Sequence, residues 1–155
     1  MDAPGLPPRR DWVVRPLDHA MTVRRNLIFQ SEAFNTSERK DYFINDCCFG
    51  EDFSGWLVSA LSNEGVDADV LCMEDFGWAN VANFEGASYL MCVAGATEGD
   101  TGRPNFGEWR VMLERRRTLF QKIFGKNKIS VSDPLVGKVK YVLQSAGFTD
   151  VAIQP

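Results

Sequence analysis

The stretch GWANVANFEGASYLMCVAG, residues 77–95, decides the fold of this 155-residue chain. Aliphatic and aromatic residues stand on both sides of a central pair, Glu85-Gly86, as in two neighbouring strands. A polar residue followed by glycine suits a tight turn. The stretch therefore predicts two antiparallel strands joined at Glu85-Gly86.

A helix is expected before this hairpin, because apolar residues recur there at i, i+3, i+4, i+7 and i+8. These residues are Phe53, Trp56, Leu57, Ala60 and Leu61. Glu51 and Asp52 fall in the first turn, where carboxylates face the positive end of the helix dipole. Gly65 follows as a C-terminal cap, and VDADVLCM (66–73) predicts a strand that leads into the hairpin.

The rest of the chain completes an α+β pattern. We expect strands at 21–30, 108–115 and 148–154, and a short helix at 118–125. A last helix opens at Ser132-Asp133-Pro134, with a capping side chain followed by proline in the first turn. The order β-α-β-β-β-β-α-α-β predicts a mostly antiparallel sheet of five or six strands, packed with two main helices and one short helix.

Length and composition indicate one domain. Residues 1–18 contain four prolines and little periodicity, which is typical of a flexible arm, and residues 19–155 form a single α+β domain. The two arginines near the start are not followed by an apolar segment, and no apolar run is long enough to span a bilayer. We therefore expect a cytoplasmic protein without a membrane partner, in which the four cysteines are buried, reduced thiols.

Charge is distributed very unevenly along the chain. Residues 41–102 contain 12 of the 21 acids and no lysine or arginine, whereas the remaining residues hold nine acids and all 17 bases. The net charge of −4 therefore hides a segment of −12 within flanks of +8. Such asymmetry favours a basic partner, or else serves only solubility.

Motifs for common chemistries are missing from the sequence. There is no phosphate-binding loop or nucleophile elbow, and the single histidine, His19, has no supporting motif. The acid pairs Glu51-Asp52 and Glu74-Asp75 could hold Mg²⁺ in an enzyme, but each also fits an exposed position at the end of an element. The basic stretch at 110–128 could contact nucleic acid, although the acidic segment would repel phosphates.

The whole-chain profile of size, element pattern and acidity resembles small bacterial immunity proteins of polymorphic-toxin and type VI secretion systems. That resemblance implies a non-enzymatic inhibitor without a metal or cofactor, which occludes a basic toxin or effector. In size and acidity the chain is also similar to secretion chaperones and to phage-type acidic inhibitors, which remain alternatives beside the magnesium-dependent enzyme. The residues expected to contact the partner are Glu51, Asp52, Glu74, Asp75, Trp78, Glu85, Tyr89, Glu98, Asp100 and Phe106.

Overall fold

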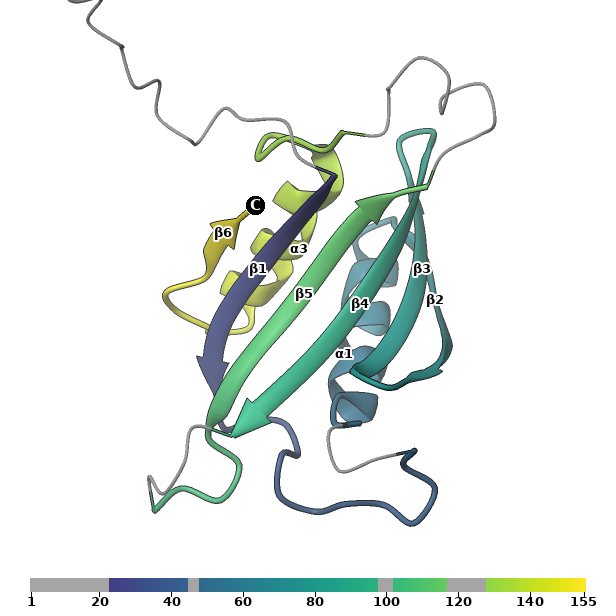
Figure 1. Cartoon of the computed structure of the whole chain (residues 1–155). Coiled ribbons are helices and arrows are strands. Elements are labelled where there is room, and N and C mark those ends of the chain that lie inside the picture. Colours follow the sequence, from purple (N-terminus) through teal and green to yellow (C-terminus); the bar gives the residue numbers. More distant parts are fainter. Residues whose placement is uncertain (1–22, 45–47, 98–101, 117–127) are drawn as a thin grey trace, which may run out of the picture.

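The computed structural model describes residues 23–44, 48–97, 102–116 and 128–155, which form a six-stranded antiparallel sheet with two helices (Figure 1). The elements are β1 (Arg24–Ser31), α1 (Glu51–Asn63), β2 (Asp67–Glu74), β3 (Gly77–Phe84), β4 (Ala87–Thr97), β5 (Gly107–Arg115), α3 (Pro134–Ser145) and β6 (Ala152–Gln154). The predicted α+β class is therefore confirmed. The arm predicted at 1–18 and the short helix predicted at 118–125 lie outside the described residues.

Local chemistry sets the ends of these elements. Glu85 and Gly86 have φ of 49° and 77°, the pair of positive values that a two-residue hairpin turn needs. The Asp133 side chain accepts hydrogen bonds from the backbone N–H of Leu135 (2.9 Å) and Val136 (3.5 Å), which caps α3. The last strand is shorter than predicted, because Asp150 has a φ of 57° and interrupts the extended run before β6.

The strand order in the sheet is β2-β3-β4-β5-β1-β6. The hairpins of β2 to β5 follow chain order, and β1 lies between β5 and the C-terminal strand. This register places Trp109 of β5 directly between Phe29 of β1 and Gly95 of β4. The sheet thus depends on pairings between residues about 80 to 130 positions apart.

Both helices lie on the same side of the sheet, behind it in Figure 1. Phe53, Leu57 and Leu61 of α1 are fully buried against the strands, and burial of each contributes about 1.5–3 kcal/mol. The core contains a group of aromatic rings with centroids 4.7–6.1 Å apart. Its members are Phe29, Phe34, Phe53, Trp56, Trp109 and Phe148.

The opposite face of the sheet is covered by neither helix (Figure 1). In β5 the core-facing residues Trp109, Val111 and Leu113 are fully buried, whereas the alternate residues Glu108, Met112 and Glu114 are half-buried and Arg110 is exposed. The same alternation holds in β1. Within the described residues, this face of the sheet therefore lies outside the core that the helices complete.

Candidate functional site

A groove of about 940 Å³ lies on the uncovered face, over β4 and β5. Its apolar part includes Cys92, Ala94 and Met112. Phe76 and Asp75, from the turn between β2 and β3, line the groove together with Phe49 from the chain before α1. The remaining lining residues are Arg24, Val93, Gly95, Ala96, Glu108 and Arg110.

The groove exists because β4 continues past the start of β3 and carries small residues there. Trp78 of β3 pairs with Val93, so residues 94–97 of β4 pair only with β5. The Ala94-Gly95-Ala96 run offers almost no side-chain volume at this point. The groove is therefore bordered by the β2–β3 turn on one side and by charged residues of β1 and β5 on the other.

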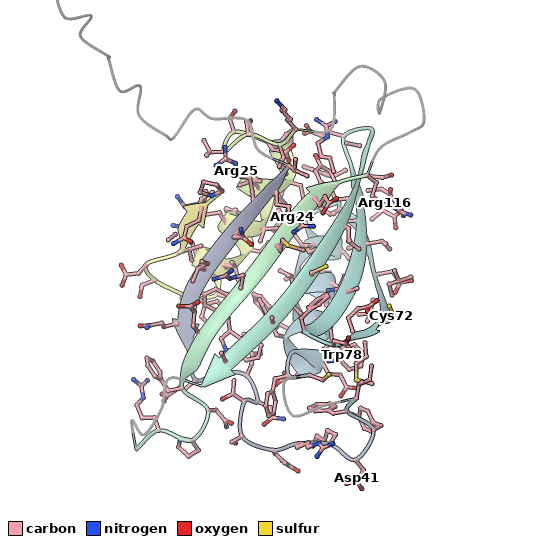
Figure 2. All side chains as sticks on the ribbon, viewed as in Figure 1. Arg24, Arg25, Asp41, Cys72, Trp78 and Arg116 are labelled. Carbon is pink, nitrogen blue, oxygen red and sulfur yellow. The ribbon has the colours of Figure 1, made fainter. Side chains whose placement is uncertain are left out.

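The charged groups on the β1 and β5 side form ion pairs. Arg24 Nε lies 3.0 Å from a Glu114 carboxylate oxygen, and an Arg110 guanidinium nitrogen lies 3.7 Å from Glu108. Figure 2 shows Arg24 on the uncovered face. On the other side of the groove, the β2–β3 turn contributes the carboxylate of Asp75.

Five exposed acids lie toward the end of the sheet where α1 begins, and one of them, Asp75, lines the groove. We call Asp41, Glu51, Asp52, Glu74 and Asp75 the acidic end. Two hydrogen bonds link the chain before α1, which leads to Glu51 and Asp52, to the β2–β3 hairpin, which carries Glu74 and Asp75. The Cys48 thiol lies 3.2 Å from the carbonyl oxygen of Glu74, and Trp78 Nε1 donates to the Cys48 carbonyl oxygen (3.1 Å). Tyr42 and Phe76, 55% and 45% exposed, lie among these acids.

Two bases in the loops beside the helix start, Arg103 and Lys40, pair with acids from outside the base-free segment. Arg103 Nε pairs with Glu32 at 2.7 Å, which lowers the pKa of Glu32. Lys40 Nζ pairs with Glu38 at 3.3 Å. These two ion pairs use no carboxylate of the acidic end, and Arg116 is labelled at the opposite end of the sheet in Figure 2.

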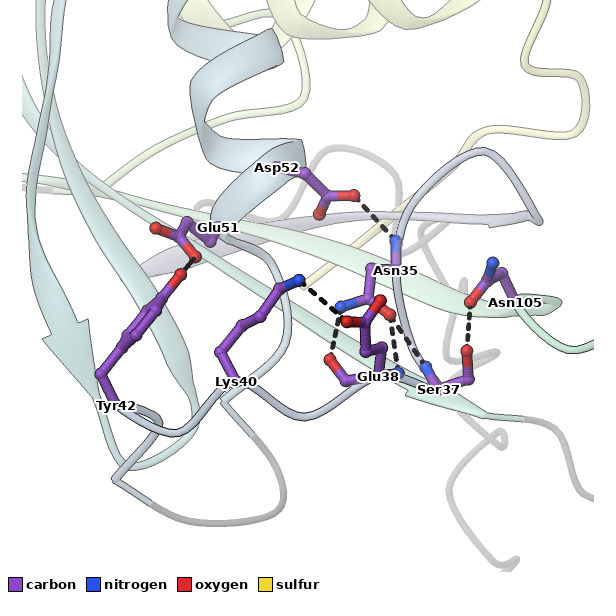
Figure 3. A network of polar contacts seen from close by, with 8 residues as sticks. All are labelled: Asn35, Ser37, Glu38, Lys40, Tyr42, Glu51, Asp52 and Asn105. Atoms are coloured by element: carbon purple, nitrogen blue, oxygen red, sulfur yellow. Dashed lines mark hydrogen bonds and ion pairs between the residues drawn. The ribbon is translucent and has the colours of Figure 1, made fainter.

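A network of polar contacts fixes the loop after β1 to the start of α1 (Figure 3). Asp52 accepts a hydrogen bond from the backbone N–H of Asn35 (2.8 Å). Tyr42 donates its hydroxyl to Glu51, and this bond raises the pKa of Tyr42. Ser37 donates to the Asn105 side chain (2.7 Å) and so joins the loop to the chain before β5. Glu51 and Asp52 consequently have a structural role as well as a charge.

The structure separates the residues predicted to contact a partner. Glu51, Asp52, Glu74 and Asp75 are exposed at one end, whereas Glu85 is exposed at the far end of β3. Glu98 and Asp100 lie outside the described residues.

The three aromatic candidates differ from one another. Tyr89 is only 1% exposed and donates its hydroxyl to both carboxylate oxygens of Asp133, each at 3.0 Å, so it belongs to the core and is not a surface anchor. Trp78 is half-buried, with its N–H used in the bond to Cys48. Phe106 is half-buried beneath Arg103, whose guanidinium carbon lies 4.1 Å from the ring centroid.

Sequence reasoning missed the groove residues Arg24, Cys92, Arg110 and Met112, as well as Tyr42 and Phe76 as exposed aromatics. Arg110 and Met112 occupy the outward positions of the alternating stretch at 108–115, and that was the available signal. The other groove residues can be recognised only from the order of the strands in the sheet, and the periodicity of the sequence does not reveal that order. Cys72 also departs from expectation, because it is exposed while Cys48 and Cys92 are buried.

The groove is lined by charged and apolar side chains and by one thiol, Cys92. Among the described residues, no group of three or more histidine, cysteine, aspartate or glutamate side chains could hold a metal ion. Burial raises the pKa of Cys92 to about 11, so at neutral pH this thiol stays protonated and is a poor nucleophile. In the same part of the chain, no helix has the length and apolarity needed to cross a membrane.

The fold and the groove thus define an α+β protein with a one-sided antiparallel sheet and an exposed acidic end. Comparison with protein-family models, curated proteins and solved structures finds no match to this chain.

Proposed function

We propose that this protein is a non-enzymatic binding protein that neutralises a basic protein partner, as an immunity protein acting on a toxin or effector. The observation that carries the proposal is the acidic end, with five exposed carboxylates and two exposed aromatic rings beside an apolar groove. Such an arrangement combines long-range attraction with a hollow for an anchoring side chain.

The acids attract the partner before contact. A field of one sign at one end of the molecule raises the rate of encounter and orients a basic partner toward that end. The groove then accepts an apolar side chain or the stem of a long basic one, whose charged head remains near Asp75. Neutralisation follows from steric occlusion of the partner's own functional surface, and it requires no chemistry in this chain.

The test is a double charge reversal, Glu74→Lys with Asp75→Lys. These side chains are chosen because Glu51 and Asp52 also hold the loop shown in Figure 3. The partner is captured from the source cell, purified and measured by surface plasmon resonance over a range of salt concentrations. We expect association to slow by about tenfold or more at low salt, with a flatter dependence on salt.

The matched control is Glu64→Lys with Glu85→Lys, which reverses two exposed acids of the same segment at the opposite end of the sheet. It changes the net charge equally and should alter association far less. Thermal melting of both variants checks that each remains folded. If the Glu74 and Asp75 reversal leaves the association rate and its salt dependence unchanged, the proposal is wrong.

A further inference from the structure

Strand β2 forms one edge of the sheet, at the right of Figure 1. Its inner side pairs with β3 from Asp67 to Glu74, and no strand of the described residues pairs with its outer side. The opposite edge, β6, has only three residues. A long edge presents backbone N–H and C=O groups to any extended chain that reaches it.

Apolar side chains are exposed along this edge. Val70 and Leu71 are 36% and 59% exposed, and Phe76 follows in the turn at 45%. The register shifts between Val70 and Cys72, so Leu71 has no residue opposite it in β3. The outer edge of the sheet therefore carries exposed apolar side chains, and Phe76 in the turn that follows lines the groove.

The charges of β2 disfavour pairing with a second copy of the same strand. β2 contains Asp67, Asp69 and Glu74 and no base. Two antiparallel copies centred on Val70 and Leu71 would set Asp67 against the Glu74 of the other copy, and no shifted register sets an acid opposite a base. Like charges on directly opposed residues destabilise a strand pair, whereas lysine or arginine at those positions would stabilise it.

The face on which these acids lie follows from the register. Ala68 and Val70 are opposite Ala82 and Asn80, which are fully buried beneath the helices. Asp69 is opposite Val81, on the uncovered face. A strand added outside β2 would therefore need basic residues toward the uncovered face and apolar residues toward α1, in alternation.

We infer that β2 binds an extended segment of the partner, with alternating basic and apolar residues, by adding it as a seventh strand of the sheet. The inference rests on the proposed function and specifies how the basic partner is held. Backbone hydrogen bonds supply part of the affinity, and the acids select the charge of the added strand. The acids and the bulge at Leu71 also keep the edge from pairing with copies of itself.

The test uses the full chain and a capped seven-residue peptide of alternating lysine and valine. Hydrogen–deuterium exchange followed by mass spectrometry locates the bound peptide, and fluorescence anisotropy of a labelled copy measures its affinity. We expect slower amide exchange in residues 67–74 and little change in residues 152–154. The same peptide with alternate amides N-methylated should bind about tenfold more weakly or worse, because it lacks donors for the edge.

Two variants of the chain supply the matched comparison. Leu71→Lys places a cation on the edge and should weaken peptide binding by about fivefold or more, since lysine on an edge strand repels a basic strand. Val23→Lys replaces another exposed apolar residue, 43% exposed and outside the edge, and should change binding by less than about twofold. Both carry the same change of charge.

Three results would overturn the inference: no peptide binding, equal binding of the N-methylated peptide, or exchange protection confined to residues 87–97 and 107–115. Binding measurements with the purified partner distinguish a failure of this inference from a failure of the proposed function. If partner binding responds to the Glu74 and Asp75 reversal but not to Leu71→Lys, the proposed function holds and the edge inference is wrong. If no basic partner responds to the charge reversal, the proposed function itself fails.

Discussion

Trp109 of β5 and Gly95 of β4 fit closely together on neighbouring strands. Trp109 is fully buried and contacts Phe34 and Phe53 edge to face, at centroid distances of 5.5 and 5.3 Å. Its ring lies across Gly95, where an added Cβ would be 2.5 Å from a ring carbon. Glycine is required here by space and not by backbone angle, since the φ of Gly95 is not in the left-handed region.

We expect Gly95→Ala to destabilise the protein by about 1–3 kcal/mol, because the Trp109 ring must move within a filled core. The control is Gly137→Ala in α3, where an added Cβ meets nothing within 4 Å. Alanine at this helix position should stabilise the protein by about 0.5–1 kcal/mol. Urea denaturation monitored by tryptophan fluorescence measures both, and a neutral Gly95→Ala would contradict the packing described.

At the scale of elements, Asp133 joins α3 to the sheet. Its carboxylate caps the first turn of α3 and also accepts the buried hydroxyl of Tyr89 in β4. One side chain thus fixes both the start of the helix and its position on the strands.

Asp133→Ala should lower the free energy of unfolding by more than the loss of a helix cap alone would. The cap contributes about 1 kcal/mol, and the orphaned Tyr89 hydroxyl adds about 1–3 kcal/mol. Tyr89→Phe removes the hydroxyl, so in the double variant the cost of Asp133→Ala should shrink, with a coupling of about 0.5–3 kcal/mol. Tyr141→Phe, at an exposed tyrosine of the same helix, is the control. Additive effects in the double-mutant cycle would argue against the link.

The elements themselves could be predicted because their causes are local. The apolar spacing of α1, the Asp133-Pro134 start of α3 and the Glu85-Gly86 turn each act within a few residues, and all three are present in the structure. The position of β1 between β5 and β6 depends on distant pairings, and no nearby residue encodes it. The burial of Tyr89 was missed for the same reason, since its partner Asp133 is 44 residues away.

At the scale of the whole molecule, the sheet has one face that packs against both helices and another that neither helix covers. The composition of the acidic segment correctly suggested surface carboxylates, because all nine of its acids in the described residues are exposed. The groove could not be predicted, since it arises where the β2–β3 turn lies beside the small residues of β4. The sequence therefore predicts the exposed carboxylates but not the groove beside the β2–β3 turn.

Cys92, which lines the groove on the uncovered face, makes the stability of the protein depend on pH in the alkaline range. Burial raises its pKa from an ordinary value of 9.0 to about 11, with a smaller effect from the negative charge of Glu114. Between these values the unfolded chain loses the thiol proton while the folded protein keeps it, so the unfolded state binds fewer protons and stability falls as pH rises. The contribution is fully present below about pH 9 and is lost as pH rises through about 11.

We therefore expect the free energy of unfolding to decline between pH 9 and pH 11, and to decline less steeply in Cys92→Ala. The measurement is urea denaturation at a series of pH values in the presence of a phosphine reductant, which prevents thiol oxidation. Any cavity left by the substitution lowers stability equally at every pH, so the slope reports ionisation alone. Tyr89, whose pKa is also raised by burial, adds to the decline above about pH 10 in both proteins. Parallel curves for the two proteins from pH 8 to pH 11 would show that the Cys92 thiol ionises as readily in the folded protein as in the unfolded chain.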